Sequence, residues 1–394
     1  MALSGAKALI RKAFGFPEAR DAFGLVVLNK SGMAVTPENA INVPAVSCAI
    51  SKISETVGDL PAKLFARDDR RAAKQHPIYK LIHDEANEFT SAAQLRATLT
   101  RDALLHGKGF AHVVRSFDGR PLELQRIDPS IVRCDFDDDG TPFYVVNAGR
   151  QNIRLEYTDV LHIQPPGGIS PIDAGREAIG LAMAFEAHIA RLFANGARPS
   201  GIITATKSLD AEAKKKLSAG WFSTHSGSNS GGTAILDEGM QYQQIAMTLT
   251  DAQFAENRLE QIREIARVFN VPPTMLFELT RGTWSNTEEM ARQFYQITLK
   301  PWLTAWTWAY ARVLLTPEER ARYYIEFVTD DLLTTDFSKK ATALGQYRSM
   351  GAMTANEVRA LLNLQPHPEG DSLSNPHITT PTDQPADPAQ DEPV

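Results

Sequence analysis

Two long helical patterns, residues 171–196 and 250–270, flank a small segment of this chain, residues 199–247, and limit the folds open to it. Apolar residues recur every three or four positions in both patterns, which predicts two amphipathic helices. At about 1.5 Å per residue, the first helix is a rod about 40 Å long. Thr250 and Gln253 have the spacing of a capping box, which predicts that the second helix begins at this threonine. A small module carried on two rods is a projection from the rest of the molecule.

The segment between the rods has the pattern of a small α/β module. Residues 201–204 predict a strand and residues 210–221 a helix, followed by a loop rich in glycine and serine at residues 226–232. Two further β-rich runs, 233–236 and 241–245, have the spacing of a hairpin. The rods themselves end at residues that stop helices: Asn195-Gly196, Pro199 and Pro272-Pro273.

The chain before the rods mixes helices with a strand-rich region. Residues 44–58 and 91–106 carry apolar residues at helical spacing. Between residues 109 and 163, short β-rich runs alternate with turn signals such as Asp139-Gly140, which predicts a small antiparallel sheet. The strand-like runs are residues 63–65, 110–114, 121–124, 130–134, 143–146 and 160–163.

The chain after the rods begins with an aperiodic loop, residues 277–287, and continues as a very long helical pattern over residues 288–315. Pro301 lies inside that pattern and predicts a kink, because proline removes a hydrogen bond and clashes with the preceding turn. Residues 379–394 combine four prolines and four acidic residues with no basic residue, which predicts a disordered tail. The remaining elements are a strand at 323–327 and helices at about 337–349 and 354–363.

Charge and cysteine content exclude several classes of protein. The net charge of −6, from 41 basic and 47 acidic residues, argues against a protein that coats nucleic acid, because such proteins are usually basic. Cys48 and Cys134 stand far apart in the sequence, which excludes a CxxC zinc or redox site and fits a reducing cytosol.

Residues 1–12 resemble a short amphipathic helix rather than a secretory signal, because Lys7 interrupts the apolar stretch. No uncharged apolar run reaches about 18 residues, so we expect no membrane span.

The sequence contains no motif for catalysis, for a cofactor or for a metal ion. Residues 135–140, Asp-Phe-Asp-Asp-Asp-Gly, resemble the start of an EF-hand loop, but Val146 stands where that loop needs a bidentate glutamate. We therefore expect an ordinary turn there, because Asp and Gly are typical turn residues. The spaced histidine pairs lack a carboxylate cluster at ligand spacing: His76 with His83, and His106 with His112. We expect no enzyme, and the alternative is a hydrolase whose catalytic residues meet only in space.

Two clusters of residues suggest packing or docking. Lys214-Lys-Lys216 predicts either a solvated helix face or a docking patch for an acidic partner. Trp302, Trp306 and Trp308 lie close together on the long helical pattern. They predict packing in the core or at a subunit interface rather than base stacking, because no basic residues alternate with them.

The aperiodic loop carries a third set of candidate residues. Arg281, Trp284 and Asn286 lie between two long helical patterns. The loop is either an ordinary surface loop or one that rods hold in place to present side chains to a bound or passing molecule.

A series of short strings occurs in a fixed order along the chain. The strings are Val43-Pro-Ala-Val-Ser-Cys-Ala-Ile, Glu55-Thr-Val-Gly-Asp-Leu-Pro61, His76-Pro-Ile-Tyr-Lys-Leu-Ile, Gly168-Ile-Ser-Pro-Ile, Phe193-Ala-Asn-Gly-Ala-Arg-Pro-Ser-Gly201, Ile265-Ala-Arg-Val-Phe-Asn-Val-Pro-Pro273, Lys300-Pro301-Trp and Gly351-Ala-Met-Thr-Ala-Asn-Glu-Val-Arg359. In this order, over residues 36–365, the chain resembles the portal proteins of long-tailed double-stranded DNA phages or of phage-like gene transfer agents. It departs from them at His106-Gly-Lys-Gly-Phe-Ala, where the family usually has a Gly-Asn-aromatic turn.

The resemblance implies an α+β, mostly helical fold with a wing, a two-helix stem, a small α/β clip, a long kinked helix and a helical crown. The implied divisions are an N-terminal segment (1–25), an α/β wing (26–170), stem helix 1 (171–198), the clip (199–247), stem helix 2 (248–273), the tunnel loop (274–287), the long kinked helix with a wing strand (288–331), the crown (332–378) and the acidic tail (379–394).

The resemblance also implies a role. The chain would form a ring of about twelve copies at one capsid vertex of a virion assembled in the host cytoplasm. Double-stranded DNA would pass through the ring without sequence readout. Its other partners would be the major capsid protein, the large terminase and head-to-tail adaptor proteins, with no membrane and no cofactor.

Two groups of residues take roles from the resemblance. The tunnel loop would face the DNA, and the clip helix would dock partners. The tunnel-loop residues are Arg281, Thr283, Trp284 and Asn286, and the docking residues are Lys214, Lys215, Lys216, Trp221 and Phe222. A different virion protein, such as a scaffold, shell or adaptor protein, remains the main alternative, and the module on two rods and the kinked helix speak against it.

Overall fold

The chain divides into two units, residues 1–327 and 328–394. Within them, the computed structural model describes residues 29–149, 151–194, 201–204, 210–225, 240–244, 248–278, 287–329, 337–362 and 364–373. The predicted N-terminal segment 1–25 and the acidic tail 379–394 lie outside the described residues.

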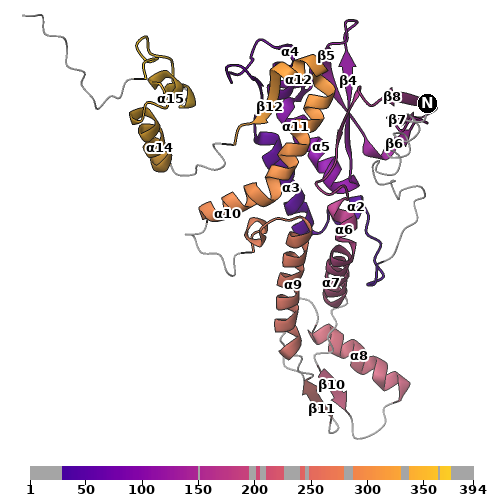
Figure 1. Ribbon diagram of the computed structural model, residues 1–394. Coiled ribbons are helices and arrows are strands. Elements are labelled where there is room, and N and C mark those ends of the chain that lie inside the picture. The colour runs from indigo at the N-terminus through magenta and orange to yellow at the C-terminus, as the bar shows by residue number, and fades with distance from the viewer. Residues whose placement is uncertain are drawn as a thin grey trace, which may run out of the picture. The chain divides into compact units, whose positions relative to one another are not determined.

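Two packed helices, α3 (Pro44–Asp59) and α5 (Ala92–His106), form much of the core of the first unit and confirm both predicted helices (Figure 1). Pro44 occupies the first turn of α3, where its missing N–H costs nothing. The helices approach closely at Gly58, where an added Cβ would lie 2.8 Å from the carbonyl oxygen of Ala93. A larger residue at this position would force the two helices apart.

The strand-rich region forms two three-stranded antiparallel sheets rather than the one small sheet predicted, with the orders β5-β4-β9 and β6-β7-β8. The cluster that spans both sheets consists of the buried residues Phe110, Val132, Tyr144, Val146 and Val160. The strands are β4 (Gly109–Arg115), β5 (Pro121–Ile127), β6 (Val132–Phe136), β7 (Pro142–Ala148), β8 (Gln151–Glu156) and β9 (Val160–Ile163).

The acidic run at residues 135–140 is a hairpin turn between β6 and β7, as predicted. The N–H of Asp137 donates to the carbonyl of Thr141 at 2.9 Å, and Gly140 has the left-handed φ of 76°. Among the described residues, no group of three or more His, Cys, Asp or Glu side chains is arranged to hold a metal ion.

A small sheet joins segments that are far apart in the sequence. The predicted strands at 63–65 and 323–327 pair as β1 (Ala62–Ala66) and β12 (Tyr323–Phe327), with Leu64 opposite Ile325. The shorter elements of this unit are α2 (Pro37–Ala40), α4 (Pro77–His83), β2 (Glu85–Asn87), β3 (Thr90–Ser91), the 3-10 turn η1 (Pro129–Ile131) and α12 (Pro317–Arg322).

The first predicted rod is two helices, α6 (Pro171–Ala174) and α7 (Arg176–Ala194), and not one. Gly175 separates them, and an added Cβ there would lie 2.7 Å from Cγ1 of Val268. The break therefore lets the end of α9 (Thr248–Val268) approach the start of α7. The capping box at Thr250 is wrong, because α9 begins two residues earlier.

The module between the rods contains β10 (Gly201–Thr204), α8 (Ala211–His225) and β11 (Gln241–Gln244). The strand and helix predictions are confirmed, although α8 runs one turn beyond residue 221. β11 pairs antiparallel with β10, with Ile202 opposite Gln243. The predicted partner strand at 233–236 and the loop at 226–232 lie outside the described residues.

The long predicted helix is interrupted before Pro301. It consists of α10 (Thr287–Gln293), the π-helix η5 (Phe294–Leu299) and α11 (Lys300–Leu314). Pro301 lies in the first turn of α11, where a proline is tolerated, so the irregularity falls in the π-helical turn on its N-terminal side. Figure 1 shows α10 and α11 running in different directions. Trp302 and Trp306 are buried in the core as predicted, whereas Trp308 is 65 % exposed.

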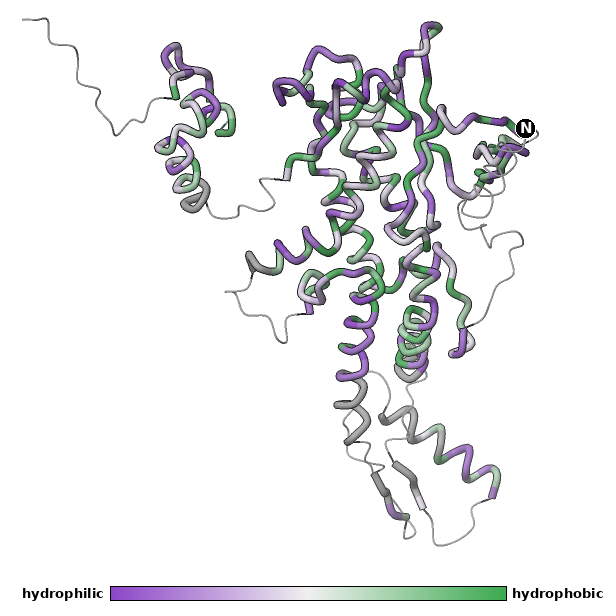
Figure 2. The backbone as a smooth tube through the Cα atoms, viewed as in Figure 1, coloured by the Kyte–Doolittle hydropathy of each residue, from purple (hydrophilic) through white to green (hydrophobic). Residues whose placement is uncertain are grey.

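The two rods differ in character. Figure 2 shows α7 as largely hydrophobic and α9 as largely hydrophilic along the part that is coloured. Among the described helices, none combines the length and the apolar content that crossing a bilayer requires.

The second unit contains α14 (Phe337–Ser349) and α15 (Ala355–Leu361), which confirm the two predicted C-terminal helices. Thr354 and Glu357 form a capping box at the start of α15. Asn356 ties the following loop to this helix, because its side-chain N–H groups donate to the carbonyl of His367 and to a carboxylate oxygen of Asp371, both at 2.9 Å.

His162 gives the first unit a measurable dependence on pH. Burial, with Arg312 and Lys108 nearby, lowers the pKa of His162 to about 3. The unfolded chain takes up a proton at a pKa near 6.5 and the folded chain does not, so stability falls as the pH drops below about 6.5. We expect the wild type to lose about 2 kcal/mol more than His162→Gln between pH 8 and pH 5. Urea unfolding of both proteins at the two pH values measures this, and equal losses would contradict it.

Candidate functional site

The two rods of the stem pack against each other near their base. α7 and α9 are in contact, and the side chain of Val268 of α9 packs against Gly175, where α6 ends and α7 begins. Further along, Ala182, Phe185 and Ile189 of α7 turn toward α9, as the apolar stripe predicted. The apolar stripe that predicts helix α7 is therefore also the face that packs toward α9.

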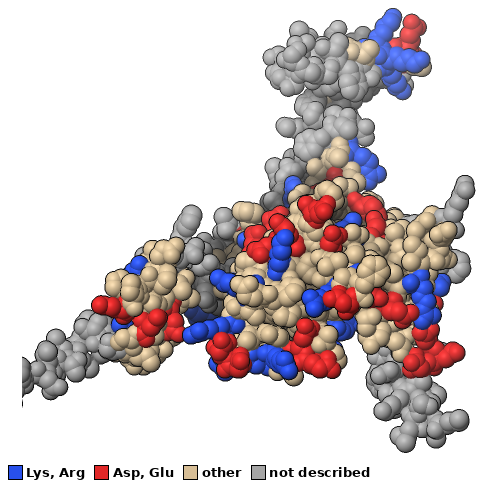
Figure 3. Space-filling model, turned by 90° about the horizontal axis from the view of Figure 1, so that it is seen from above, with Lys and Arg blue, Asp and Glu red and all other residues tan. Residues whose placement is uncertain are grey.

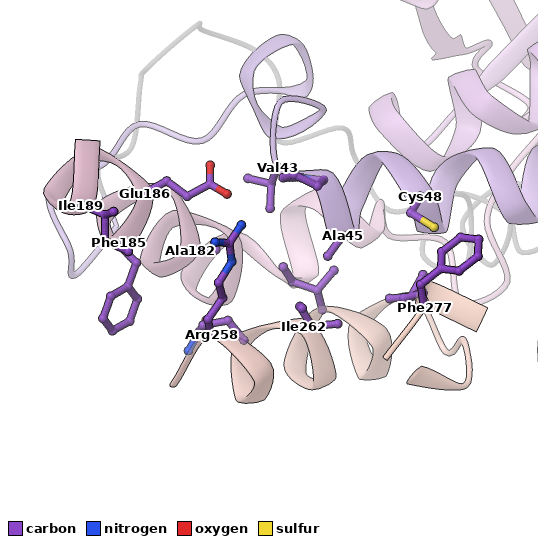
Figure 4. Close-up of a pocket in the computed structure, with 14 residues that line it drawn as sticks. Val43, Ala45, Cys48, Ala182, Phe185, Glu186, Ile189, Arg258, Ile262 and Phe277 are labelled. Carbon is purple, nitrogen blue, oxygen red and sulfur yellow. The ribbon is translucent and has the colours of Figure 1, made fainter. Parts of the chain in front are cut away.

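An apolar groove lies where α7, α9 and the start of α3 meet. It has a volume of about 240 Å³. Figure 4 shows Glu186 and Arg258 at one end of the groove and Cys48 and Phe277 at the other. The other lining residues are Val43, Pro44, Ala45, Ala182, Phe185, Ile189, Gln261, Ile262, Ile265 and Leu276.

Phe277 ends the short 3-10 helix η3 (Pro273–Leu276) that follows α9. Its backbone has a φ of 61°, in the left-handed region that bulky residues rarely adopt, and its side chain is 82 % exposed. Such backbone strain clusters at functional sites in proteins. The residue lies inside the segment predicted to be the tunnel loop, residues 274–287, whose first residues belong to η3.

Two arginines of α9, Arg263 and Arg267, pair with acidic residues close to them. Arg263 pairs with Glu260 at 3.3 Å and with Glu278 at 3.4 Å. Arg267 pairs with Glu260 at 3.2 Å and with Glu264. Figure 3 shows acidic and basic residues interspersed on the face in view, without a large patch of one sign.

Glu278 fixes the stem side of the predicted tunnel loop. Its side chain is 5 % exposed, although it is the last described residue before position 287. Burial of a carboxylate is costly without a charged partner, and Arg263 supplies one. The sequence analysis missed this anchor, because nothing in the pattern distinguishes Glu278 from a surface glutamate.

The predicted channel residues cannot be placed, because Arg281, Thr283, Trp284 and Asn286 lie outside the described residues. The three predicted docking lysines are described: Lys214, Lys215 and Lys216 are all exposed on α8. Lys216 lies 3.7 Å from Glu212, an exposed pair that contributes little. Trp221 and Phe222 lie within α8, but their side chains are outside what the structure describes.

The groove was also missed by the sequence analysis. Its apolar residues on α7 and α9 belong to the predicted helix stripes, whereas Val43, Pro44, Ala45 and Cys48 at the start of α3 were assigned no role in packing. The signal for a shared surface is absent from the sequence, because the three elements are not adjacent in the chain and meet only in the fold.

A cluster of titratable side chains in the wing is unsuited to catalysis near neutral pH. The hydroxyl of Tyr144 lies 3.0 Å from Nδ1 of His162. Burial raises the pKa of Tyr144 to about 12 and that of the Cys134 thiol to about 11, while it lowers the pKa of His162 to about 3. A general base works best with a pKa near the operating pH, and a nucleophilic cysteine needs a lowered one.

Comparison with known proteins places this fold in a family. A family model described as phage portal protein matches residues 44–363. The chain is 28 % identical over 369 residues to the probable portal protein of Streptomyces phage phiC31, covering 88 % of this chain and 80 % of the relative. It is 26 % identical over 355 residues to the portal protein of Enterobacteria phage HK97, covering 86 % and 82 %.

Solved structures share the same fold. A chain from the neck of an empty gene transfer agent particle is 24 % identical, covers 92 % of this chain and 99 % of its own length, and has a TM-score of 0.64. A phage HK97 family portal protein from Corynebacterium diphtheriae is 17 % identical, covers 76 % of this chain and 98 % of its own, and has a TM-score of 0.56. The family match covers most of the chain, and the chain belongs to the phage portal protein family.

Proposed function

We propose that this portal protein forms a closed ring at one capsid vertex, through which DNA enters during packaging and leaves during ejection. The observation that carries the proposal is the stem, in which α7 and α9 pack together and carry the β10–α8–β11 module. In a ring, this arrangement projects the module to one side, where other proteins can reach it.

Ring size follows by analogy. A similar chain, 22 % identical, comes from the neck of a native gene transfer agent particle computed with C12 symmetry. A ring requires a heterologous interface, in which one face of each copy contacts a different face of the next. We propose about twelve copies on these grounds.

Charge on the described stem fits DNA that has to slide. Each phosphate that a protein neutralises adds to its affinity through counterion release, so a strongly basic channel would slow movement. Arg263 and Arg267 are occupied by Glu260, Glu264 and Glu278, and the chain as a whole is acidic. In this proposal, Arg281 and Trp284 of the tunnel loop make weak contacts with the DNA backbone.

The portal itself performs no chemistry in this proposal. The shifted pKa values of Cys134, Tyr144 and His162 speak against the hydrolase alternative at this cluster. The ATPase activity for packaging belongs to a separate chain, the large terminase. The terminase and later the head-to-tail adaptors dock on the module, and the major capsid protein surrounds the ring.

Reversing the charge of the module is expected to weaken docking. The triple variant Lys214→Glu, Lys215→Glu, Lys216→Glu should bind the large terminase about tenfold or more weakly at low salt, because exposed charge pairs act mainly through long-range attraction. A matched triple variant of exposed lysines elsewhere, Lys52→Glu, Lys74→Glu and Lys80→Glu, serves as the control. Biolayer interferometry measures both, and equal affinities would remove α8 from the docking surface.

The proposal is tested by assembly. The purified chain is imaged by negative-stain electron microscopy, with light scattering on the same sample. Rings with a central hole and a mass of about half a megadalton, or about twelve times 43.4 kDa, are expected. A protein that stays monomeric both alone and when mixed with the major capsid protein would contradict it.

A further inference from the structure

The groove of the stem has the size and chemistry to bind apolar side chains. It offers about 240 Å³ lined almost entirely by apolar side chains, with one acidic and one basic residue, Glu186 and Arg258. An apolar cavity of about 150 Å³ is enough to hold a benzene ring. The groove therefore has room for one aromatic side chain and part of a second.

The chain enters the described region beside the helix that forms one wall of this groove. Asn29 is 7 % exposed, and its side-chain amide donates to the carbonyl of Arg176 at 3.4 Å. The N–H of Lys30 donates to a carboxylate oxygen of Glu177 at 3.1 Å. The side-chain amide of Asn29 also fills the space that a Cβ on Gly180 would occupy, so Asn29 packs directly against α7.

The groove begins two residues further along the same helix, at Ala182, and continues to Ile189. Gly180 and these residues lie on roughly opposite sides of α7 at about 100° per residue. Half of the way around a helix about 10 Å wide is about 16 Å, which about five extended residues span. The 28 residues that precede Asn29 are therefore several times longer than the path requires.

The composition of that segment matches the groove. It contains three phenylalanines, Phe14, Phe16 and Phe23, and ends in the uncharged run Phe23-Gly-Leu-Val-Val-Leu28. Burying such a side chain in an apolar groove is favourable. Phe23 lies six residues before Asn29, which is enough for the path around α7 of about five extended residues.

We propose that residues 14–28 of the same chain pass around α7 and bind in the groove between α7, α9 and α3, with phenylalanine side chains as the anchors. The segment then ties together the two stem helices and the first helix of the wing. This contact is independent of ring formation, because all of its parts come from one chain.

Cys48 is a built-in probe, because it lines the groove and the chain has only one other cysteine. In a Cys134→Ser background, maleimide labelling of Cys48 in the full chain is compared with the variant Phe14→Ser, Phe16→Ser, Phe23→Ser. The triple variant should react about tenfold or more faster, since the segment no longer covers the thiol. A control variant with changes to charged residues of the same segment, Glu18→Ser, Arg20→Ser, Asp21→Ser, should react like the parent.

Three outcomes decide the proposal. Faster labelling in the phenylalanine variant alone, with the same rate at low and high protein concentration, supports it. Equal rates in all three proteins would show that residues 14–28 do not cover the groove and would overturn it. Protection in the parent that disappears on dilution would assign the groove to a second copy and would equally overturn it.

Discussion

Trp306→Ala is expected to lower the free energy of unfolding by about 3–5 kcal/mol, the range for removing a fully buried aromatic side chain. Trp306 has no exposed surface, and its indole N–H donates to Oγ1 of Thr100 at 3.0 Å. The centroid of its ring also lies 5.0 Å from that of Tyr310. The substitution therefore leaves a cavity beside Tyr310 and removes the hydrogen-bond donor to the Thr100 hydroxyl on α5. Chemical unfolding followed by circular dichroism measures the effect.

The same helix supplies the control. Trp308 lies two residues further along α11 and is 65 % exposed. Trp308→Ala should change the free energy of unfolding by less than about 1 kcal/mol, because little surface is buried there. A loss at Trp308 as large as that at Trp306 would contradict the placement of α11 in the core.

Arg96→Ala is expected to cost about 3–5 kcal/mol, an unusually large effect for an arginine. The Arg96 side chain is 1 % exposed and donates to the carbonyls of Ile82 at 2.6 Å and Gly58 at 2.8 Å. Its guanidinium carbon also lies 5.8 Å from the ring centroid of Phe327. Removing it leaves two buried carbonyls without these donors, each at about 1–3 kcal/mol, and opens a cavity.

Arg101 is the matched residue, because it is an exposed arginine on the same helix α5. Arg101→Ala should leave the free energy of unfolding within about 0.5 kcal/mol of the parent. Thermal unfolding of both variants separates the two cases. Similar melting temperatures for Arg96→Ala and the parent would show that Arg96 does not join α3, α4, α5 and β12.

The helices were predictable where one face of the sequence is apolar. α3, α5, α14 and α15 were placed within a few residues of their observed ends by periodicity. The break at Gly175 was not predicted, because its reason is the close approach of Val268 from another helix. A glycine inside a helical pattern carries no information about the neighbour that it accommodates.

Strands with buried apolar residues were predictable even without strict alternation, as β4 and β9 show. β8 was missed because five of its six residues are exposed, so it lacks a buried face. Pairing was less predictable than strand position. β1 with β12, and β10 with β11, join segments that the chain separates by helices, and no local turn signal connects them.

The candidate site also contains parts that were predictable from local sequence patterns and parts that were not. The module on two rods and the exposed Lys214–Lys216 run follow from local patterns in the sequence. The groove and the buried Glu278–Arg263 pair depend on contacts between distant segments, so single positions gave no signal for them. The tunnel-loop assignment of Arg281 and Trp284 rests on the family resemblance and stays a prediction.

Reconstruction of the intact particle by electron cryomicroscopy without imposed icosahedral symmetry tests the portal assignment most directly. The expected result is a single ring of about twelve copies of this chain at one vertex of the capsid. Residues 201–244 should lie on the side of the ring that faces out of the capsid. Density for this chain at the sixfold and fivefold positions of the shell, or its absence from every vertex, would contradict the assignment.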